Sequence, residues 1–533
     1  MKRILKYISK VVVLICILIV PIILLISCHE DSELQIELKE GLIEGKFHTA
    51  SNVIQYLGVP YAKPPIGNLR WRMPEPNTAW KGVKKATDFA PSAMQLNLGQ
   101  GYNKFETATA EDCLYLNLWT PKIKPDNLMP VLVILHGGGF TSGSGAQENI
   151  NGNNMASLGT VVITVNYRLN VFGFFTHPQL VTESNQDLAG NYGLYDQLLA
   201  LQWIRNNVER FGGNPENITL SGNSAGAMAI NAHICSELSQ NLFSKVIVSS
   251  GSLTWKQPHM FSKMIRDSTV FSRLGYNNIE ALRKLPADSL LGLYREMKNP
   301  FLFGPIVDGY LIKDQLISEY DAKACFDIPM IIGYTSHEIS GKGYMKDTDY
   351  TEEAFESLAR KKFKKHHPEV LSIFPHSTAE EIELSSTEIA SLLFQTFNTW
   401  KWYSLQKNIN SENLYLYVFS KHIAYSKDDS LNYNFEDHHV RGPHHSSDVP
   451  YALNNLGRLN GYNFETLDYT VAENFSQYLF NFIKTSNPNS DELTEWPSIS
   501  RANKYLIIDT LMHLGNTASF EEKFLLFDKI HTK

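Results

Sequence analysis

Two unbroken apolar runs, residues 131–135 (VLVIL) and 161–165 (VVITV), place the strongest constraint on the fold of this chain. A strand that is apolar at every position has both faces buried, as strands do in a parallel sheet covered by helices. Apolar residues recur at helical spacing between residues 193 and 211, and further strands are predicted at residues 245–249, 328–332 and 414–419. This alternation predicts an α/β fold with a large, mostly parallel central sheet flanked by helices.

The rest of the chain extends this sheet without dividing it. Short alternating strands in residues 34–60 predict an antiparallel edge, and residues 341–411 have the pattern of helical insertions. By length alone, 533 residues would suit about three domains. No Pro-, Gly- or Ser-rich linker and no internal repeat separates them, so we expect a single domain over residues 36–533.

Residues 1–27 have the features of an export signal: basic residues, an apolar run and the small residue Ser27. Cys28 follows directly, which resembles a bacterial lipobox, in which this cysteine becomes the lipidated first residue. The alternative is an uncleaved membrane anchor, but the run is shorter than the about 20 residues of a span, and Pro21 interrupts it. We expect residues 28–35 to tether a lipid-anchored protein to the bacterial cell envelope, facing the periplasm or the cell surface.

Charge and cysteine content narrow the classes of partner. The net charge of −7 and the pI of 6.2 exclude nucleic acid as a partner, since no concentrated basic stretch offsets them.

Of the five cysteines, Cys16 lies in the signal and Cys28 is assigned to a lipid, so that Cys113, Cys235 and Cys325 remain. Their odd number and wide spacing predict neither a disulfide framework nor a metal site, and each is expected to be a small buried apolar residue.

Ser224 is the candidate nucleophile, because it is the serine of a G-x-S-x-G motif between a predicted strand and a predicted helix. The strand is expected at residues 217–220 and the small-residue helix at residues 225–235. A sharp turn between them would expose the serine hydroxyl and aim the positive helix N-terminus at a developing oxyanion. The run HGGGF at residues 136–140 follows another strand, and its glycine N–H groups are the expected oxyanion donors; the alternative is a glycine-rich turn.

The general base and its carboxylate should follow the serine in the order acid, then histidine. Glu338 comes just after the strand at residues 328–332 and is the predicted acid. Asp308 is a rival, but the run PIVDG around it is typical of a structural turn. The base is expected in residues 436–448, which hold four histidines, and the pattern alone does not separate His444 from His445. No H-x-x-x-H or H-E-x-x-H spacing occurs there, so no metal is predicted.

The chain resembles the type-B carboxylesterase/cholinesterase family over about residues 37–513. The motifs that carry this resemblance occur in the family's order: YLGVPYA (56–62), PPIGNLRW (64–71), EDCLYLN (111–117), NYRL (166–169), GNYGLYDQ (190–197), FGGNP (211–215), YLY (415–417) and TSNPN (485–489). The resemblance implies the α/β-hydrolase fold. It also implies that His445, three residues before Asp448, is the base, that Glu338 is the acid, and that the oxyanion donors are the N–H groups of Gly138, Gly139 and Ala225.

The resemblance further implies a buried pairing of Arg70 with Glu111 and exposes departures from the family pattern. Asn223 stands before the nucleophile where the family usually has Glu, which removes a negative charge and makes choline esters less suitable substrates. Cys113 lacks the family's partner cysteine near residue 93 and is expected to be a free thiol. Ala227 replaces a common glycine, a mild change.

These observations predict a serine carboxylic-ester hydrolase that acts on a small-molecule ester through an acyl-enzyme intermediate, without a cofactor or metal. The alternative is a non-catalytic cell-surface binding protein on the same fold, since fold alone does not imply function. The chain retains Ser224, Glu338, His445 and the glycine run, which favours the enzyme.

Overall fold

The computed structural model describes residues 34–96, 103–299, 302–346, 348–410, 412–424 and 442–531. The expected export signal and the lipidation site Cys28 lie outside these residues, as do His438 and His439. Within the described part of the chain, no helix combines the length and apolar character that crossing a membrane requires.

An eleven-stranded sheet forms the centre of the molecule. Its strands from β15 to β10 pair in parallel, and antiparallel strands complete both edges. In spatial order the strands are β16 (His513–Asn516), β15 (Lys504–Ile508), β14 (Leu414–Phe419), β13 (Met330–Thr335), β12 (Lys245–Ser249), β11 (Gly213–Asn223), β9 (Met129–Leu135), β10 (Val161–Val165), β8 (Tyr115–Thr120), β4 (Val53–Pro60) and β3 (Lys46–His48).

The alternation of side chains along each strand divides the core between the two faces of the sheet. On β9, Val131, Val133 and Leu135 join the cluster that contains the buried side of α5 (Tyr192–Asn207) and α6 (Ala225–Ile234). Leu132 and Ile134 join the cluster of α2 (Asn153–Ser157), α16 (Asp448–Ala452) and α17 (Thr466–Thr485). Every position of β10 is buried, because helices cover both faces, and each large apolar side chain there contributes about 1.5–3 kcal/mol.

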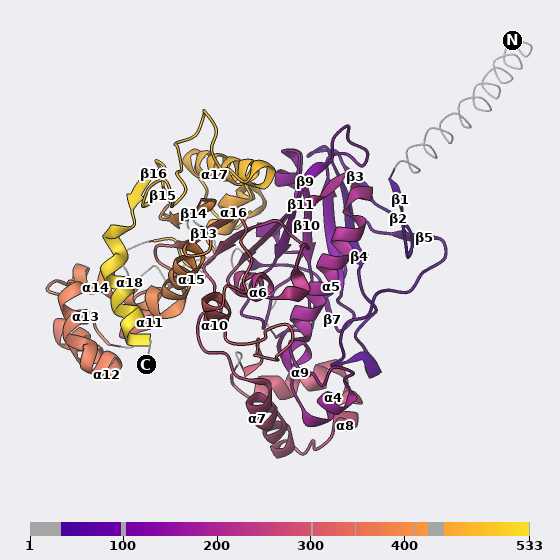
Figure 1. Cartoon of the computed structure of the whole chain (residues 1–533), viewed down its shortest axis with the longest axis horizontal. Helices are drawn as coiled ribbons and strands as arrows, with labels where there is room; N and C mark the ends of the chain where they lie inside the picture. Colours follow the sequence, from indigo (N-terminus) through magenta and orange to yellow (C-terminus); the bar gives the residue numbers. More distant parts are fainter. Residues whose placement is uncertain are drawn as a thin grey trace, which may run out of the picture.

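Further helices and short strands lie around this sheet (Figure 1). One group, at the bottom of the view, is α7 (Met260–Arg273), α8 (Ile279–Arg283) and α9 (Ala287–Glu296). A second group, on the left, is α11 (Lys342–Met345), α12 (Glu352–Phe363), α13 (His367–Ile373), α14 (Ala379–Ser391) and α18 (Ala518–His531). Other helices and short strands are α3 (Asn170–Phe174), α4 (Pro178–Glu183), α10 (Leu316–Asp321), α15 (Phe397–Lys407), β1 (Gln35–Leu38), β2 (Gly41–Glu44), β5 (Val83–Lys85), β6 (Ser92–Ala93) and β7 (Thr109–Ala110).

The predicted strands at residues 161–165, 245–249 and 414–419 coincide with β10, β12 and β14. The expected antiparallel edge is confirmed by β3 and β4, which pair in that sense at one side of the sheet. β1 and β2 also pair antiparallel, but they form a separate three-stranded sheet with β5. The expected buried pair is also confirmed: Arg70 donates from Nε and Nη2 to the two carboxylate oxygens of Glu111, at 2.6 and 2.7 Å.

One prediction about the cysteines is wrong. Cys235, at the end of α6, forms a disulfide with Cys325, which follows α10, across 90 residues of sequence. Spacing along the chain gave no sign of this pair, because the fold itself brings the ends of two distant helices together. Cys113 is confirmed as buried and free among the described residues.

Candidate active site

Ser224 forms the turn between the end of β11 and the start of α6. Its φ of +56° and ψ of −123° lie in a region that non-glycine residues rarely adopt. Its N–H donates to the carbonyl of Ser249 on β12 at 2.9 Å, which fixes the strained turn. The predicted strand and helix around this serine are therefore confirmed, and the serine lies at the carboxyl end of a parallel strand.

The two glycines of the motif allow this turn because the chain passes close to each of them. A Cβ at Gly226 would lie 2.1 Å from the carbonyl oxygen of Leu135 at the end of β9. A Cβ at Gly222 would lie 2.6 Å from the carbonyl carbon of Gly226. Contacts this short exclude any side chain, so the glycines set the distance between β11, α6 and β9.

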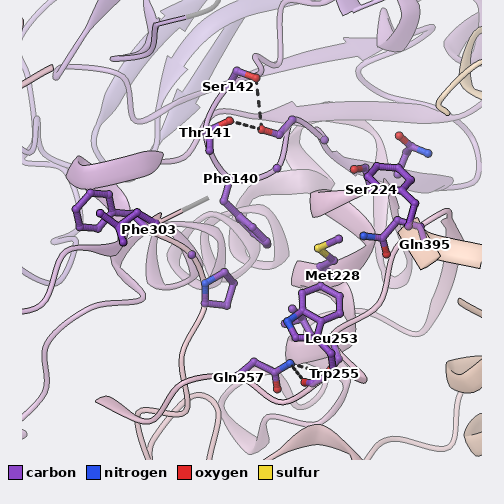
Figure 2. Close-up of a pocket in the computed structure, with 18 of the residues that line it drawn as sticks. Phe140, Thr141, Ser142, Ser224, Met228, Leu253, Trp255, Gln257, Phe303 and Gln395 are labelled. Atoms are coloured by element: carbon purple, nitrogen blue, oxygen red, sulfur yellow. Dashed lines mark hydrogen bonds between the residues drawn. The ribbon is translucent and has the colours of Figure 1, made fainter. Parts of the chain in front are cut away.

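The glycine run lies against the nucleophile. A Cβ placed on Gly137 would be 3.2 Å from the Cβ of Ser224. Gly138 and Gly139 have φ angles of +114° and +63°, and the Gly138 carbonyl accepts hydrogen bonds from the N–H groups of Thr141 and Ser142, both at 3.0 Å. The hydroxyls of Thr141 and Ser142 donate to the same carbonyl, at 3.0 and 3.4 Å (Figure 2). No described residue accepts a hydrogen bond from the N–H of Gly138, Gly139 or Ala225. Unpaired N–H groups beside a serine are the arrangement that an oxyanion requires.

Glu338 and His445 are joined directly. The Nδ1 of His445 is 2.5 Å from Oε2 of Glu338, whose other oxygen accepts from the Ser250 hydroxyl at 2.5 Å and the Thr335 N–H at 2.9 Å. The backbone N–H of His445 also donates to the Glu338 carbonyl at 3.0 Å. With Nδ1 held by the carboxylate, Nε2 is the ring nitrogen left for proton transfer.

The neighbouring histidine has a different environment. His444 forms a hydrogen bond through Nδ1 with the carbonyl of His445 at 2.9 Å, and burial lowers the pKa of His444.

The rival carboxylate Asp308 accepts from the N–H groups of three consecutive residues, Tyr310, Leu311 and Ile312, each at 3.0 Å. Asp308 thus has the structural role in a turn that its sequence context indicates.

Asn223 bridges the two sides of the turn. Its side-chain N–H donates to the Ser249 hydroxyl at 2.9 Å. Its side-chain amide oxygen accepts from the hydroxyl of Ser446, the neighbour of His445. Behind this bridge, Asp448 is buried and accepts from the Tyr417 hydroxyl at 2.7 Å. Burial raises the pKa of Asp448, with the nearby Glu338 acting in the same direction.

Ser224 and His445 line one cavity of about 670 Å³, most of whose wall is apolar (Figure 2). Sequence reasoning missed several of its residues. Phe394 and Gln395 belong to η8 (Leu392–Thr396), a π-helical turn between α14 and α15, and the Phe394 ring meets the His445 ring edge-on at 5.0 Å. Lys263 and Arg266 come from α7. No motif marks these positions, because they lie in insertions whose direction is set by tertiary packing.

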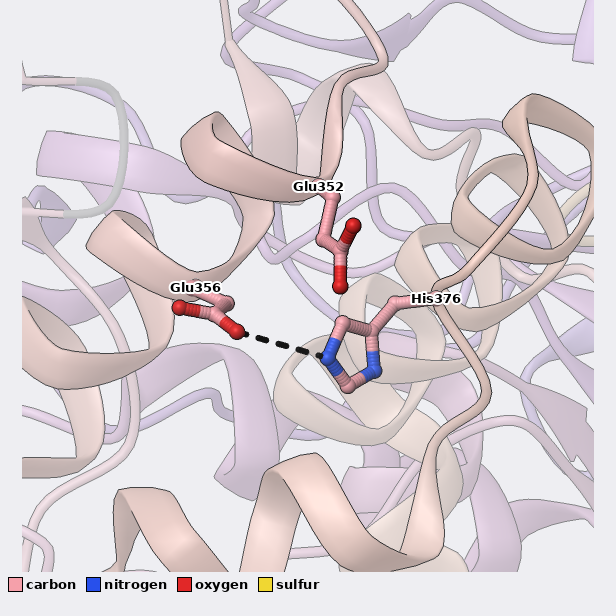
Figure 3. Close-up of side chains that lie close together, drawn as sticks. All are labelled: Glu352, Glu356 and His376. Carbon is pink, nitrogen blue, oxygen red and sulfur yellow. Dashed lines mark ion pairs between the residues drawn. The ribbon is translucent and has the colours of Figure 1, made fainter.

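One group among the described residues has the donor atoms of a metal site, and it lies elsewhere. Ligand atoms of Glu352, Glu356 and His376 lie within 4.8 Å of one another (Figure 3). Glu352 is exposed and Glu356 already forms an ion pair with Arg360, so the charge of this group is partly neutralised and open to water. None of these residues lines the cavity of Ser224.

Comparisons with known proteins identify the family and the fold of the chain. The profile of the carboxylesterase family matches residues 32–523. A fumonisin B1 esterase from Sphingopyxis macrogoltabida is 36% identical over 317 residues, which span 58% of this chain and 57% of that protein. A cholinesterase from Mus musculus is 30% identical over 90% of this chain and 84% of its own length. The solved structure of a PNB esterase is similar with a TM-score of 0.78 at 26% identity, covering 93% of this chain and 99% of that one.

Proposed function

The chain belongs to the carboxylesterase family and is an ester hydrolase with the α/β-hydrolase fold, and we propose that Ser224, Glu338 and His445 form its catalytic triad. The substrate is a small-molecule carboxylic ester, and the reaction passes through an acyl-enzyme intermediate on Ser224. No cofactor is required for this chemistry.

In the first half of the reaction, Ser224 Oγ attacks the carbonyl carbon of the ester while Nε2 of His445 takes the hydroxyl proton. The carbonyl oxygen becomes an oxyanion, which the N–H groups of Gly138, Gly139 and Ala225 stabilise. The bond between the carbonyl carbon and the alcohol oxygen then breaks, and His445 returns the proton to the leaving alcohol. Ser224 is left carrying the acyl group.

In the second half, water attacks the acyl carbon and His445 takes a proton from that water. The oxyanion forms again at the same donors and collapses with cleavage of the bond to Ser224 Oγ, which regains the proton. The products are a carboxylic acid and the free enzyme. In both halves of the reaction Glu338 orients His445 and stabilises its imidazolium form.

The contact that carries the proposal is the 2.5 Å pairing of His445 Nδ1 with Glu338, from a histidine that lines the same cavity as Ser224. The strained φ of Ser224 and the unpaired glycine N–H groups beside it support the same roles. The hydrogen bond from Ser224 Oγ to His445 that the triad requires is part of the proposal.

Replacing Ser224 with Ala should lower kcat for p-nitrophenyl acetate by about 10⁴-fold or more, as losses of a triad residue do elsewhere. The Ser224→Ala variant should also lose labelling by a fluorophosphonate probe, because the probe reacts with an activated serine hydroxyl. The neighbouring histidines provide a matched pair: His445→Ala should be inactive and His444→Ala should keep most of the activity. An active His445→Ala with an inactive His444→Ala would move the base by one position.

We also propose that the protein is lipid-anchored through Cys28 in the bacterial cell envelope. The disulfide between Cys235 and Cys325 supports export, since disulfides persist in oxidising compartments. Growth with an alkyne-tagged fatty acid should label the protein, and Cys28→Ser should abolish the label without reducing the activity of the purified enzyme. Equal labelling of both forms would contradict the anchor.

A further inference from the structure

The charged side chains that line the cavity of Ser224 are of one sign. Lys263 and Arg266, both on α7, are positively charged, and no described residue in the lining is Asp or Glu. Asn223 beside the nucleophile is neutral as well. The protein carries a net charge of −7 overall, so this local excess of positive charge is opposite in sign to the molecule as a whole.

Lys263 is fully engaged within the protein. Its ammonium donates to the Phe174 carbonyl at 2.7 Å, forms an ion pair with the buried carboxylate of Asp267, and lies 4.8 Å from the centre of the Phe303 ring. Burial lowers the pKa of Lys263 to about 8, while Asp267 opposes this shift, so the group stays charged at neutral pH. Lys263 and Asp267 therefore neutralise each other, and the remaining positive charge is that of Arg266.

The guanidinium of Arg266 is held in place by hydrogen bonds to described residues that do not use all of its N–H donors. Its Nη2 donates to the Leu302 carbonyl at 2.7 Å, and Nε and Nη2 each lie 3.3 Å from one oxygen of Asp267. Among the described residues, none accepts a hydrogen bond from Nη1. The side chain is 42% exposed and lines the cavity, so a positioned guanidinium presents unused donors to whatever enters.

An apolar wall completes the cavity that Arg266 and Ser224 share. Phe140, Met228 and Leu253 line it, and in the view of Figure 2 Phe140 lies between Ser224 and Phe303, the neighbour of Leu302. A substrate that contacts both polar ends must therefore carry an apolar chain or ring between its ester and its second polar group.

We propose that Arg266 binds a carboxylate of the substrate, so that the enzyme prefers esters carrying a free carboxylate, separated from the ester by an apolar spacer, over neutral esters of the same shape. A guanidinium is the side chain best suited to a carboxylate, because its planar N–H groups match the carboxylate oxygens and remain charged at all physiological pH values. This inference rests on the proposed function, since it assigns the substrate class of the same site.

Two matched substrate pairs test the preference on either side of the ester. Monomethyl adipate is compared with methyl hexanoate, and 4-acetoxybutanoate is compared with butyl acetate, with kcat/KM followed by titration of released acid. A carboxylate that reaches Arg266 should raise kcat/KM by about tenfold in at least one pair, the effect of one charge-assisted hydrogen bond. The preference should weaken as salt concentration rises, because Arg266 is partly exposed to solvent.

Variants of α7 assign the preference to one residue. Arg266→Gln should remove the advantage of the anionic ester, so that kcat/KM becomes nearly equal for the two members of each pair, and Arg266→Lys should retain part of the advantage. Arg273→Gln is the control, since Arg273 lies on the same helix, is exposed and does not line the cavity. Thermal unfolding of each variant separates a specific effect from a loss of folding.

The outcomes separate this inference from the proposed function. If the wild type hydrolyses the neutral esters as fast as the anionic ones in both pairs, or if Arg266→Gln slows both members equally, the carboxylate site is wrong while the triad stands. If no ester is hydrolysed at all, the proposed function fails and the inference fails with it.

Discussion

Asn223 directly precedes the proposed nucleophile Ser224, at a position where the family usually has Glu. It donates to the Ser249 hydroxyl and accepts from the Ser446 hydroxyl, and so connects the serine turn to the segment that carries His445. A carboxylate at this position accepts hydrogen bonds but cannot donate one. Compared with Glu, Asn223 therefore leaves the cavity without a negative charge and supplies the N–H that donates to Ser249.

Replacing Asn223 with Glu should raise the preference for cationic esters. A carboxylate near the substrate adds an attraction of about 1 kcal/mol for a cation in a wet site, or roughly fivefold in kcat/KM. The measurement is the ratio of kcat/KM for acetylcholine to that for its neutral isostere 3,3-dimethylbutyl acetate. Asn223→Gln changes the size but not the charge, so an equal rise in that variant would contradict the electrostatic explanation.

Much of the site could be predicted at the scale of single residues, because local chemistry marks it. Ser224 is recognisable from a serine between two glycines after a strand, and Glu338 from a carboxylate just after another strand. His445 could not be separated from His444 by such reasoning, since the choice depends on which ring faces Glu338 once the turn has formed. Phe394 and Arg266 could not be predicted, because each is placed by an insertion packed onto the cavity.

At the scale of elements, the position of α6 depends on a contact that only glycine allows. Gly226→Ala should destabilise the protein and reduce activity, because the new Cβ would collide with the Leu135 carbonyl and displace the helix behind Ser224. Gly292→Ala is the matched control: this glycine lies within α9 and has nothing within 4 Å of an added Cβ. It should stabilise the protein by about 0.5–1 kcal/mol, the helix preference for Ala over Gly.

Urea unfolding followed by circular dichroism measures both substitutions, and p-nitrophenyl acetate turnover reports on the site. A Gly226→Ala variant as stable and active as the wild type would show that α6 can move away from β9 at little cost.

The elements that sequence patterns predicted well are those buried on both faces. β10 and β14 are buried throughout and agree with their predicted bounds. The helical content of residues 341–411 was predicted, but not the π-helical turn η8 inside it, because one additional residue in a helical turn leaves no compositional trace. The bridge between Cys235 and Cys325 was missed for a related reason, since it depends on where two helices end relative to each other.

At the scale of the whole molecule, buried histidines connect the fold to pH. Burial lowers the pKa of His136, His233 and His337 to about 4 from an ordinary value of 6.5. Between these values the unfolded chain binds protons that the folded protein does not, so the free energy of unfolding falls as the pH falls from 6.5 towards 4. Above pH 6.5 this part of the stability is fully present.

Lowering the pH through this window should therefore reduce the free energy of unfolding by up to about 1.4 kcal/mol per pH unit for each histidine. The midpoint of thermal unfolding should shift to lower temperature accordingly. His233→Gln should make this dependence shallower, since His233 is completely buried. His513→Gln, at an exposed position, should leave it unchanged. A stability that does not vary between pH 6.5 and 4 would mean that these histidines protonate without unfolding.

The two edge strands of the central sheet, β3 and β16, bear on how readily copies of the protein could associate through backbone pairing. A sheet of eleven strands has two edges however wide it is, and here β3 and β16 are only three and four residues long. Each edge thus presents few unpaired backbone groups, and polar residues such as Lys46 and His513 interrupt them. Short polar edges are poor templates for adding a strand from another chain. Where copies pack side by side at high concentration, β3 and β16 therefore offer only short edges to a strand from a neighbouring copy.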